Sequence, residues 1–126
     1  MKFVHTMIRV KDLDESMKFY KELLEMNQTG EVELDDCTLY YLSDEDGQTQ
    51  IEMTYNKETP KEGYTNGNAF GHFAFELDKM SDFTEKMNKL GYKYLYEPFF
   101  MPQVNMYIAF LNDPNGNEIE IMAKQA

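Results

Sequence analysis

An internal repeat constrains the fold of this chain more than any other feature of its sequence. The only two histidines, His5 and His72, lie 67 residues apart, in the similar stretches VHTMIRV (residues 4–10) and GHFAFEL (residues 71–77). Later in each half, LSDEDG (residues 42–47) corresponds to LNDPNG (residues 111–116), and IEM (residues 51–53) corresponds to IEI (residues 119–121). A unit of about 60 residues cannot bury both faces of its sheet alone, so two units must combine. The repeat predicts an α+β fold of two βαβββ units with curved mixed sheets.

The length of the chain fits one domain built from these two units. At 126 residues it is long enough to bury a core and short for two domains. Repeat one is expected over about residues 1–56 and repeat two over about residues 69–126. Residues 57–68, which are polar and contain Pro60 and Gly63, are typical of a linker.

Hydrophobic periodicity predicts the elements of each repeat. Asp12 is a good helix N-cap, and Glu15 completes a capping box three residues later. In repeat one we expect strands at residues 2–10, 31–34, 38–42 and 49–55, and a helix to about residue 26 with a stripe of Leu13, Met17, Tyr20 and Leu24. In repeat two we expect strands at residues 70–77, 92–96, 105–111 and 117–122, a helix capped by Ser81 that ends near residue 90, and a loop at residues 97–103.

Charge and composition exclude several classes of partner. The formal net charge of −11 argues against nucleic acid and anionic membrane surfaces, which need clustered Lys and Arg. No apolar run approaches the roughly 20 residues of a membrane span, and the first residues do not resemble a secretory signal. The single Cys37 excludes an internal disulfide and disfavours a cysteine metal site. These features favour a cytoplasmic protein.

Each repeat contributes one histidine and one glutamate in matching positions. His5 and Glu52 are separated by 47 residues, and His72 and Glu120 by 48. Apolar residues alternate with all four, which predicts that the four side chains share the sheet face opposite the helices. A single His or Glu on a strand face is usually just solvated. Four of them in register across a repeat indicate a common site.

Two imidazoles and two carboxylates form a donor set for a divalent first-row ion. Ni²⁺, Co²⁺, Fe²⁺, Mn²⁺ and Zn²⁺ all accept such ligands. Four protein ligands on an octahedral ion leave two positions for water or substrate. The pattern therefore predicts a Lewis acid that could hold two neighbouring oxygens.

Arg9 and Asn56 follow His5 and Glu52 on the same strand faces. Either residue could simply lie on the surface. In a functional site, Arg9 would be the fixed cation for a substrate carboxylate, and Asn56 a neutral donor beside it.

Four motifs resemble the vicinal oxygen chelate superfamily and, within it, glyoxalase I of the short bacterial type. They are VHTMIRV (residues 4–10), IEMTYN (residues 51–56), GHFA (residues 71–74) and DPNGNEIE (residues 113–120). The resemblance covers about residues 1–123. It implies a lactoylglutathione lyase, a carbon–sulfur lyase that detoxifies methylglyoxal.

The resemblance also implies a mechanism and roles for the residues. The hemithioacetal of methylglyoxal and glutathione would become S-lactoylglutathione through an enediolate. His5, Glu52, His72 and Glu120 would hold the ion, Ni²⁺ or Co²⁺ rather than Zn²⁺. Glu120 matches the general base and Glu52 its near-symmetric partner. Arg9 and Asn56 match residues that hold the glutamyl end of glutathione. A homodimer is expected because each unit leaves an open sheet face to cover.

One segment departs from this pattern and keeps alternatives open. Where the relatives carry a Lys-Gly-Gly-like loop, residues 99–103 read FFMPQ and contain no cation, so another low-molecular-weight thiol is conceivable. Another metal enzyme of the superfamily, an epimerase or a thiol transferase, is one alternative function. A metal-free protein that binds a small hydrophobic drug is another, and the ten methionines with nine Phe and nine Tyr would suit it.

Overall fold

The structure is a computed structural model and describes all residues 1–126. The chain forms two compact units. The first unit is Met1–Thr65 and the second is Asn66–Ala126. The elements of the first unit are β1 (Thr6–Arg9), α1 (Leu13–Met17), the π-helix η1 (Lys18–Leu23), β2 (Asn27–Glu33), β3 (Cys37–Ser43) and β4 (Gln50–Asn56). Those of the second unit are β5 (His72–Lys79), α2 (Met80–Lys89), β6 (Tyr96–Met101), β7 (Met106–Asn112) and β8 (Glu118–Gln125).

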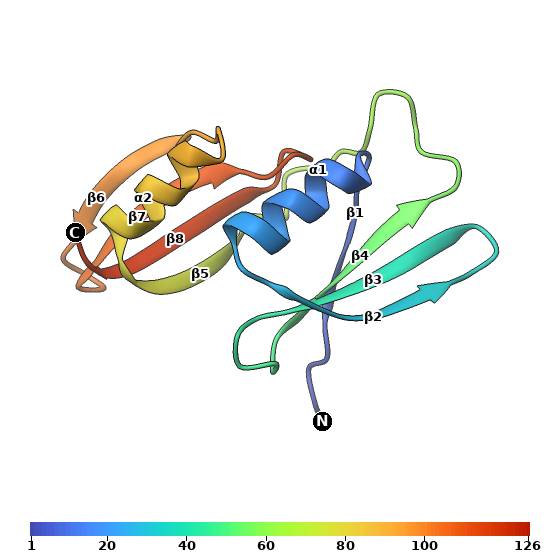
Figure 1. Cartoon of the computed structure of the whole chain (residues 1–126), viewed down its shortest axis with the longest axis horizontal. Helices are drawn as coiled ribbons and strands as arrows, with labels where there is room; N and C mark the ends of the chain where they lie inside the picture. Colours follow the sequence, from blue (N-terminus) through green and yellow to red (C-terminus); the bar gives the residue numbers. More distant parts are fainter. The chain divides into compact units, whose positions relative to one another are not determined.

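Each unit contains one four-stranded mixed sheet of the same topology. The strand order is β1-β4-β3-β2 in the first unit and β5-β8-β7-β6 in the second (Figure 1). The first strand of each unit runs parallel to the last, and the remaining neighbours are antiparallel. The predicted α+β fold of two βαβββ repeats is confirmed.

Strands β4 and β8, at the centre of the two sheets, each bury one face and leave the other partly open. In β4, Ile51 and Met53 are buried while Glu52 between them is not. In β8, Ile119 and Ile121 are buried on either side of Glu120. Alternation along the strand therefore gives each sheet an apolar core side and an opposite side that carries a partly exposed glutamate.

The first helix begins as predicted but changes its winding. The Asp12 carboxylate accepts a hydrogen bond from the backbone N–H of Glu15 at 3.1 Å, which confirms the N-cap. After Met17 the chain winds as a π-helix, which ends at Leu23 rather than near residue 26. Because a π-helix has more residues per turn, the buried face shifts away from the expected α-helical stripe. The buried side chains are Ser16, Phe19, Tyr20 and Leu23.

Two predictions in the second unit were wrong. Ser81 does not cap α2, because β5 runs directly into the helix and the extended residue Lys79 is its N-cap. Residues 92–95 do not form a strand, and most of the loop expected at residues 97–103 is instead β6, which pairs with β7. Pro98 is tolerated because β6 is an edge strand and its register shifts between Tyr96 and Phe99.

A buried aspartate holds the turn that leads into β8. The Asp113 carboxylate accepts backbone hydrogen bonds from Asn115 at 2.9 Å and from Asn117 at 2.7 Å. Gly116 supplies the positive φ of 86° that this turn requires. The turn fixes where β8 starts and so where Glu120 lies. Separately, none of the helices is long and apolar enough to cross a membrane.

Candidate active site

The strand register places one histidine beside one glutamate in each unit. Met7 pairs with Glu52 across β1 and β4, and Ala74 pairs with Glu120 across β5 and β8. Each histidine lies two residues before these positions, on the same strand face as its paired residue. His5 directly precedes β1, which is shorter than the predicted strand, whereas His72 is the first residue of β5.

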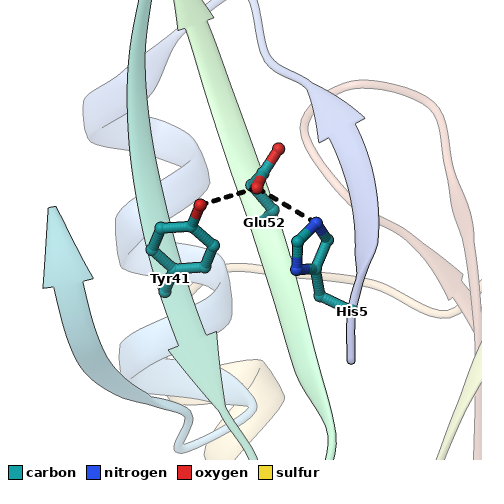
Figure 2. Close-up of polar contacts among 3 residues, drawn as sticks. All are labelled: His5, Tyr41 and Glu52. Atoms are coloured by element: carbon teal, nitrogen blue, oxygen red, sulfur yellow. Dashed lines mark hydrogen bonds and ion pairs between the residues drawn. The ribbon is translucent and has the colours of Figure 1, made fainter. Parts of the chain in front are cut away.

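In the first unit, His5, Glu52 and Tyr41 form a small polar cluster (Figure 2). The His5 Nε2 atom lies 3.0 Å from Glu52 Oε2. The Tyr41 hydroxyl donates a hydrogen bond of 2.7 Å to the same oxygen. The Glu52 side chain is only 14% exposed, so these contacts matter more than they would in open solvent.

The hydrogen bond to Glu52 also affects Tyr41. This bond, together with burial and the negative charge of Glu52, raises the pKa of Tyr41 above its ordinary value. Tyr41 therefore keeps its proton at neutral pH and acts as a donor.

The second unit repeats the histidine–glutamate pair without the hydroxyl. His72 Nε2 lies 2.8 Å from Glu120 Oε2. The Phe110 and His72 rings form a T-shaped pair with centroids 5.4 Å apart, as the Tyr41 and His5 rings do at 5.7 Å.

The geometry of both pairs fits a divalent ion. Two adjacent ligands on an octahedral ion, with bonds of about 2.1 Å, lie about 3 Å apart. The nitrogen–oxygen separations of 3.0 Å and 2.8 Å match that spacing. Neither unit by itself places a third His, Cys, Asp or Glu beside its pair. Each unit thus supplies two of the four predicted ligands.

Arg9 and Asn56 lie further along the same two strands of the first unit. Arg9 is exposed and pairs in register with Thr54, and it forms no ion pair within its unit. The Asn56 amide donates a hydrogen bond of 2.8 Å to the Tyr64 hydroxyl. No hydrogen bond joins Arg9 to Asn56. The guanidinium of Arg9 therefore remains available.

In the second unit, the residues at the positions equivalent to Arg9 and Asn56 form an ion pair with each other. Glu76 follows His72 as Arg9 follows His5, and Lys124 follows Glu120 as Asn56 follows Glu52. Lys124 Nζ lies 3.3 Å from Glu76 Oε1. An unpaired cation at this position is therefore a feature of the first unit.

Sequence reasoning missed Tyr41. The sequence did contain a sign of it. LYYLS (residues 39–43) in repeat one corresponds to IAFLN (residues 108–112) in repeat two, so Tyr41 and Phe110 occupy equivalent positions. Cys37, by contrast, is a buried free cysteine, and burial with the nearby Asp36 raises the pKa of its thiol. Cys37 is therefore a poor nucleophile.

The sequence matches one protein family over nearly its whole length. Residues 2–121 match the family described as the Glyoxalase/Bleomycin resistance protein/Dioxygenase superfamily. A lactoylglutathione lyase of Haemophilus influenzae is 36% identical over 130 residues, which cover 100% of this chain and 95% of that protein. A probable lactoylglutathione lyase of Synechocystis sp. is 36% identical and covers 97% of this chain and 95% of the relative.

Solved structures of similar proteins have the same fold. The trypanothione-dependent glyoxalase I of Leishmania major superposes with a TM-score of 0.78 at 33% identity, covering 98% of this chain and 87% of that one. Glyoxalase I of Zea mays superposes with a TM-score of 0.86 at 29% identity, covering 99% of this chain and 45% of that one.

Proposed function

Because the chain belongs to the glyoxalase/bleomycin resistance protein/dioxygenase superfamily, we propose that it is a metal-dependent glyoxalase I. The reaction converts the hemithioacetal of methylglyoxal and a low-molecular-weight thiol, glutathione in the first instance, into the lactoyl thioester. The duplicated pair, His5 with Glu52 and His72 with Glu120, carries this proposal. The similarity to several lactoylglutathione lyases over the full chain supports the choice of reaction.

The four paired residues would hold one divalent ion, two from each unit. When bound, the ion supplies a Lewis acid that stabilises negative charge developing on the substrate oxygens. Nickel is the ion we propose, with Co²⁺ and Zn²⁺ as the alternatives that the same donors accept. The two histidine–glutamate pairs around one ion would come either from the same chain or from the two chains of a dimer.

The remaining chemistry falls to side chains of this protein. Glu120 would take the proton from C1 of the hemithioacetal and return it to C2, so no proton is gained or lost overall. Glu52 would stay in place as its partner. Arg9, the unpaired cation, would bind a carboxylate of the thiol moiety, with Asn56 as a neutral donor beside it.

The thiol is the least constrained part of the substrate. The segment FFMPQ at residues 99–103 offers no cation for a second carboxylate. A similar protein is described as trypanothione-dependent, so the thiol differs among relatives. We therefore keep glutathione as the first candidate within a panel of thiols.

Two further parts of the proposal concern assembly and location. We propose a homodimer, because the open sheet face of each unit is a surface that a second chain would cover. Sedimentation as a fully active monomer at micromolar concentration would contradict it. The cytoplasmic location expected from the sequence also stays a prediction, and cell fractionation checks it.

The deciding experiment combines metal analysis with an activity assay. We expect the protein, stripped and reconstituted with Ni²⁺, Co²⁺ or Zn²⁺, to bind one ion per four-ligand set and to form the lactoyl thioester from methylglyoxal and one thiol of the panel. An epimerase or thiol transferase would bind metal but give no thioester. A metal-free drug-binding protein would bind no stoichiometric ion, and the matching geometry of the two pairs would have no purpose in it.

The Arg9→Ala variant tests the binding role of Arg9. We expect KM for the hemithioacetal to rise about tenfold with kcat little changed, because Arg9 contacts a part of the substrate that does not react. Steady-state kinetics measures both constants. Lys57→Ala, which removes a surface cation paired with Glu33 at 3.6 Å, is the control. A fall in kcat with unchanged KM would contradict the role.

A further inference from the structure

The two halves of the candidate site differ by one hydroxyl group at equivalent positions. Tyr41 on β3 pairs in register with Glu52, and Phe110 on β7 pairs in register with Glu120. Each aromatic ring forms a T-shaped pair with the neighbouring histidine, at centroid distances of 5.7 Å and 5.4 Å. The rings therefore occupy the same place in each unit, and only the tyrosine carries a donor for the carboxylate.

This hydroxyl gives Glu52 a contact that Glu120 lacks. Glu52 Oε2 lies 3.0 Å from His5 Nε2 and accepts a hydrogen bond of 2.7 Å from Tyr41, from the opposite side (Figure 2). Glu120 Oε2 lies 2.8 Å from His72 Nε2 and has no hydroxyl beside it. To turn its carboxylate, Glu52 must break two contacts, whereas Glu120 must break one.

The Tyr41 bond is of a strong kind. A hydroxyl donating to a carboxylate makes a short, charge-assisted hydrogen bond, roughly twice as strong as a neutral one. The Glu52 side chain is only 14% exposed and Tyr41 is half-buried, so the bond is partly shielded from water. The register of β3 with β4 sets Tyr41 beside Glu52, where its hydroxyl reaches the carboxylate.

We propose that Tyr41 is a positioning residue that fixes the Glu52 carboxylate, while Phe110 leaves the Glu120 carboxylate free to move. The two glutamates, alike in sequence context, thereby take different roles: Glu52 remains a fixed ligand, and Glu120 moves to transfer the proton. This inference rests on the proposed function. It explains how a nearly symmetric pair of half-sites can carry out an asymmetric reaction.

The Tyr41→Phe variant, which makes unit one resemble unit two, tests the positioning role. We expect its Ni²⁺ affinity, measured by competition with a chelator, to fall about 10-fold to 100-fold, the usual effect of losing a group that orients a ligand. Tyr40→Phe is the matched control, because Tyr40 directly precedes Tyr41 on β3 and pairs in register with the buried Met53 rather than with Glu52. We expect the control to bind Ni²⁺ like the wild type.

A second variant tests the division of roles. Once the hydroxyl is gone, Glu52 is free to turn and can replace Glu120 as base. We therefore expect Tyr41→Phe/Glu120→Gln, loaded with Ni²⁺, to be about tenfold faster than Glu120→Gln alone. A tyrosine that merely supported the fold would make the double variant slower.

The outcomes separate this inference from the proposed function. It is overturned if Tyr41→Phe binds Ni²⁺ as tightly as Tyr40→Phe, or if the metal-loaded double variant is no faster than Glu120→Gln. A wild-type protein that binds none of Ni²⁺, Co²⁺ and Zn²⁺ and forms no lactoyl thioester with any thiol of the panel would instead refute the proposed function, and this inference with it.

Discussion

We expect His5→Ala and His72→Ala each to weaken Ni²⁺ binding by more than about 100-fold and to abolish most activity. Losing a group that only orients a ligand costs 10-fold to 100-fold, and losing the ligand itself should exceed that range. Each histidine is the only imidazole of its unit and lies within 3.0 Å of the paired carboxylate. Calorimetric titration of the stripped variants with Ni²⁺ measures the effect.

A control variant keeps this result specific to the pairs. Glu45→Gln removes an exposed carboxylate from the turn between β3 and β4 and should leave Ni²⁺ binding unchanged. If both histidine variants bind one Ni²⁺ as tightly as the control, the four residues do not form a metal site.

The same two variants also reveal how the site is assembled. In a homodimer with sites built across two chains, mixing the His5→Ala and His72→Ala proteins restores one complete site, with all four ligands intact, in each mixed dimer. Sites built within one chain stay defective in every dimer. Activity that returns when the two inactive proteins are unfolded and refolded together therefore indicates a shared site, and its absence indicates a site within each chain.

The fold could be predicted well from the sequence because the internal repeat presents the same pattern of elements twice. The histidine strand, the helix, the turn ending in glycine and the glutamate strand of repeat one each had a counterpart in repeat two, and the topology of both sheets followed. The pairing of His5 with Glu52 and of His72 with Glu120 was also predictable. The first and last strands of each unit pair in parallel, so that the residue two positions after the histidine lies opposite the glutamate in both units.

The errors occurred where tertiary contacts outweigh local preference. Pro98 argued for a loop, yet pairing with β7 makes its segment an edge strand, a cost that the sequence alone does not reveal. Phe19 entered the core through a π-helical turn, which the α-helical period does not describe. Tyr41 was missed because its role depends on a contact across two strands, which alternation along one strand cannot show.

Glu120→Gln is the variant from which we expect the largest effect on the chemical step. Glutamine keeps an oxygen at the ligand position and has nearly the same shape, but it cannot accept the substrate proton. We expect metal affinity to weaken only moderately while kcat falls by roughly 10²–10⁴, the usual range for a lost general base. Glu52→Gln should reduce kcat less, because the Tyr41 hydroxyl holds Glu52 in place as a ligand.

Glu118→Gln provides the matched control for Glu120→Gln. Glu118 lies two residues earlier on the same face of β8, pairs in register with His72 and, like Glu120, is partly exposed, but the His72 imidazole forms its ion pair with Glu120. We expect Glu118→Gln to keep the wild-type rate, which would show that the charge at position 120, rather than negative charge on this strand, is what the reaction needs. The comparison must be made with the metal content of each protein measured, because an empty site would also lower the rate. A Glu120→Gln enzyme that is fully loaded and nearly as fast as the control would leave proton transfer to another group, and the four ligands would then serve only to bind the ion.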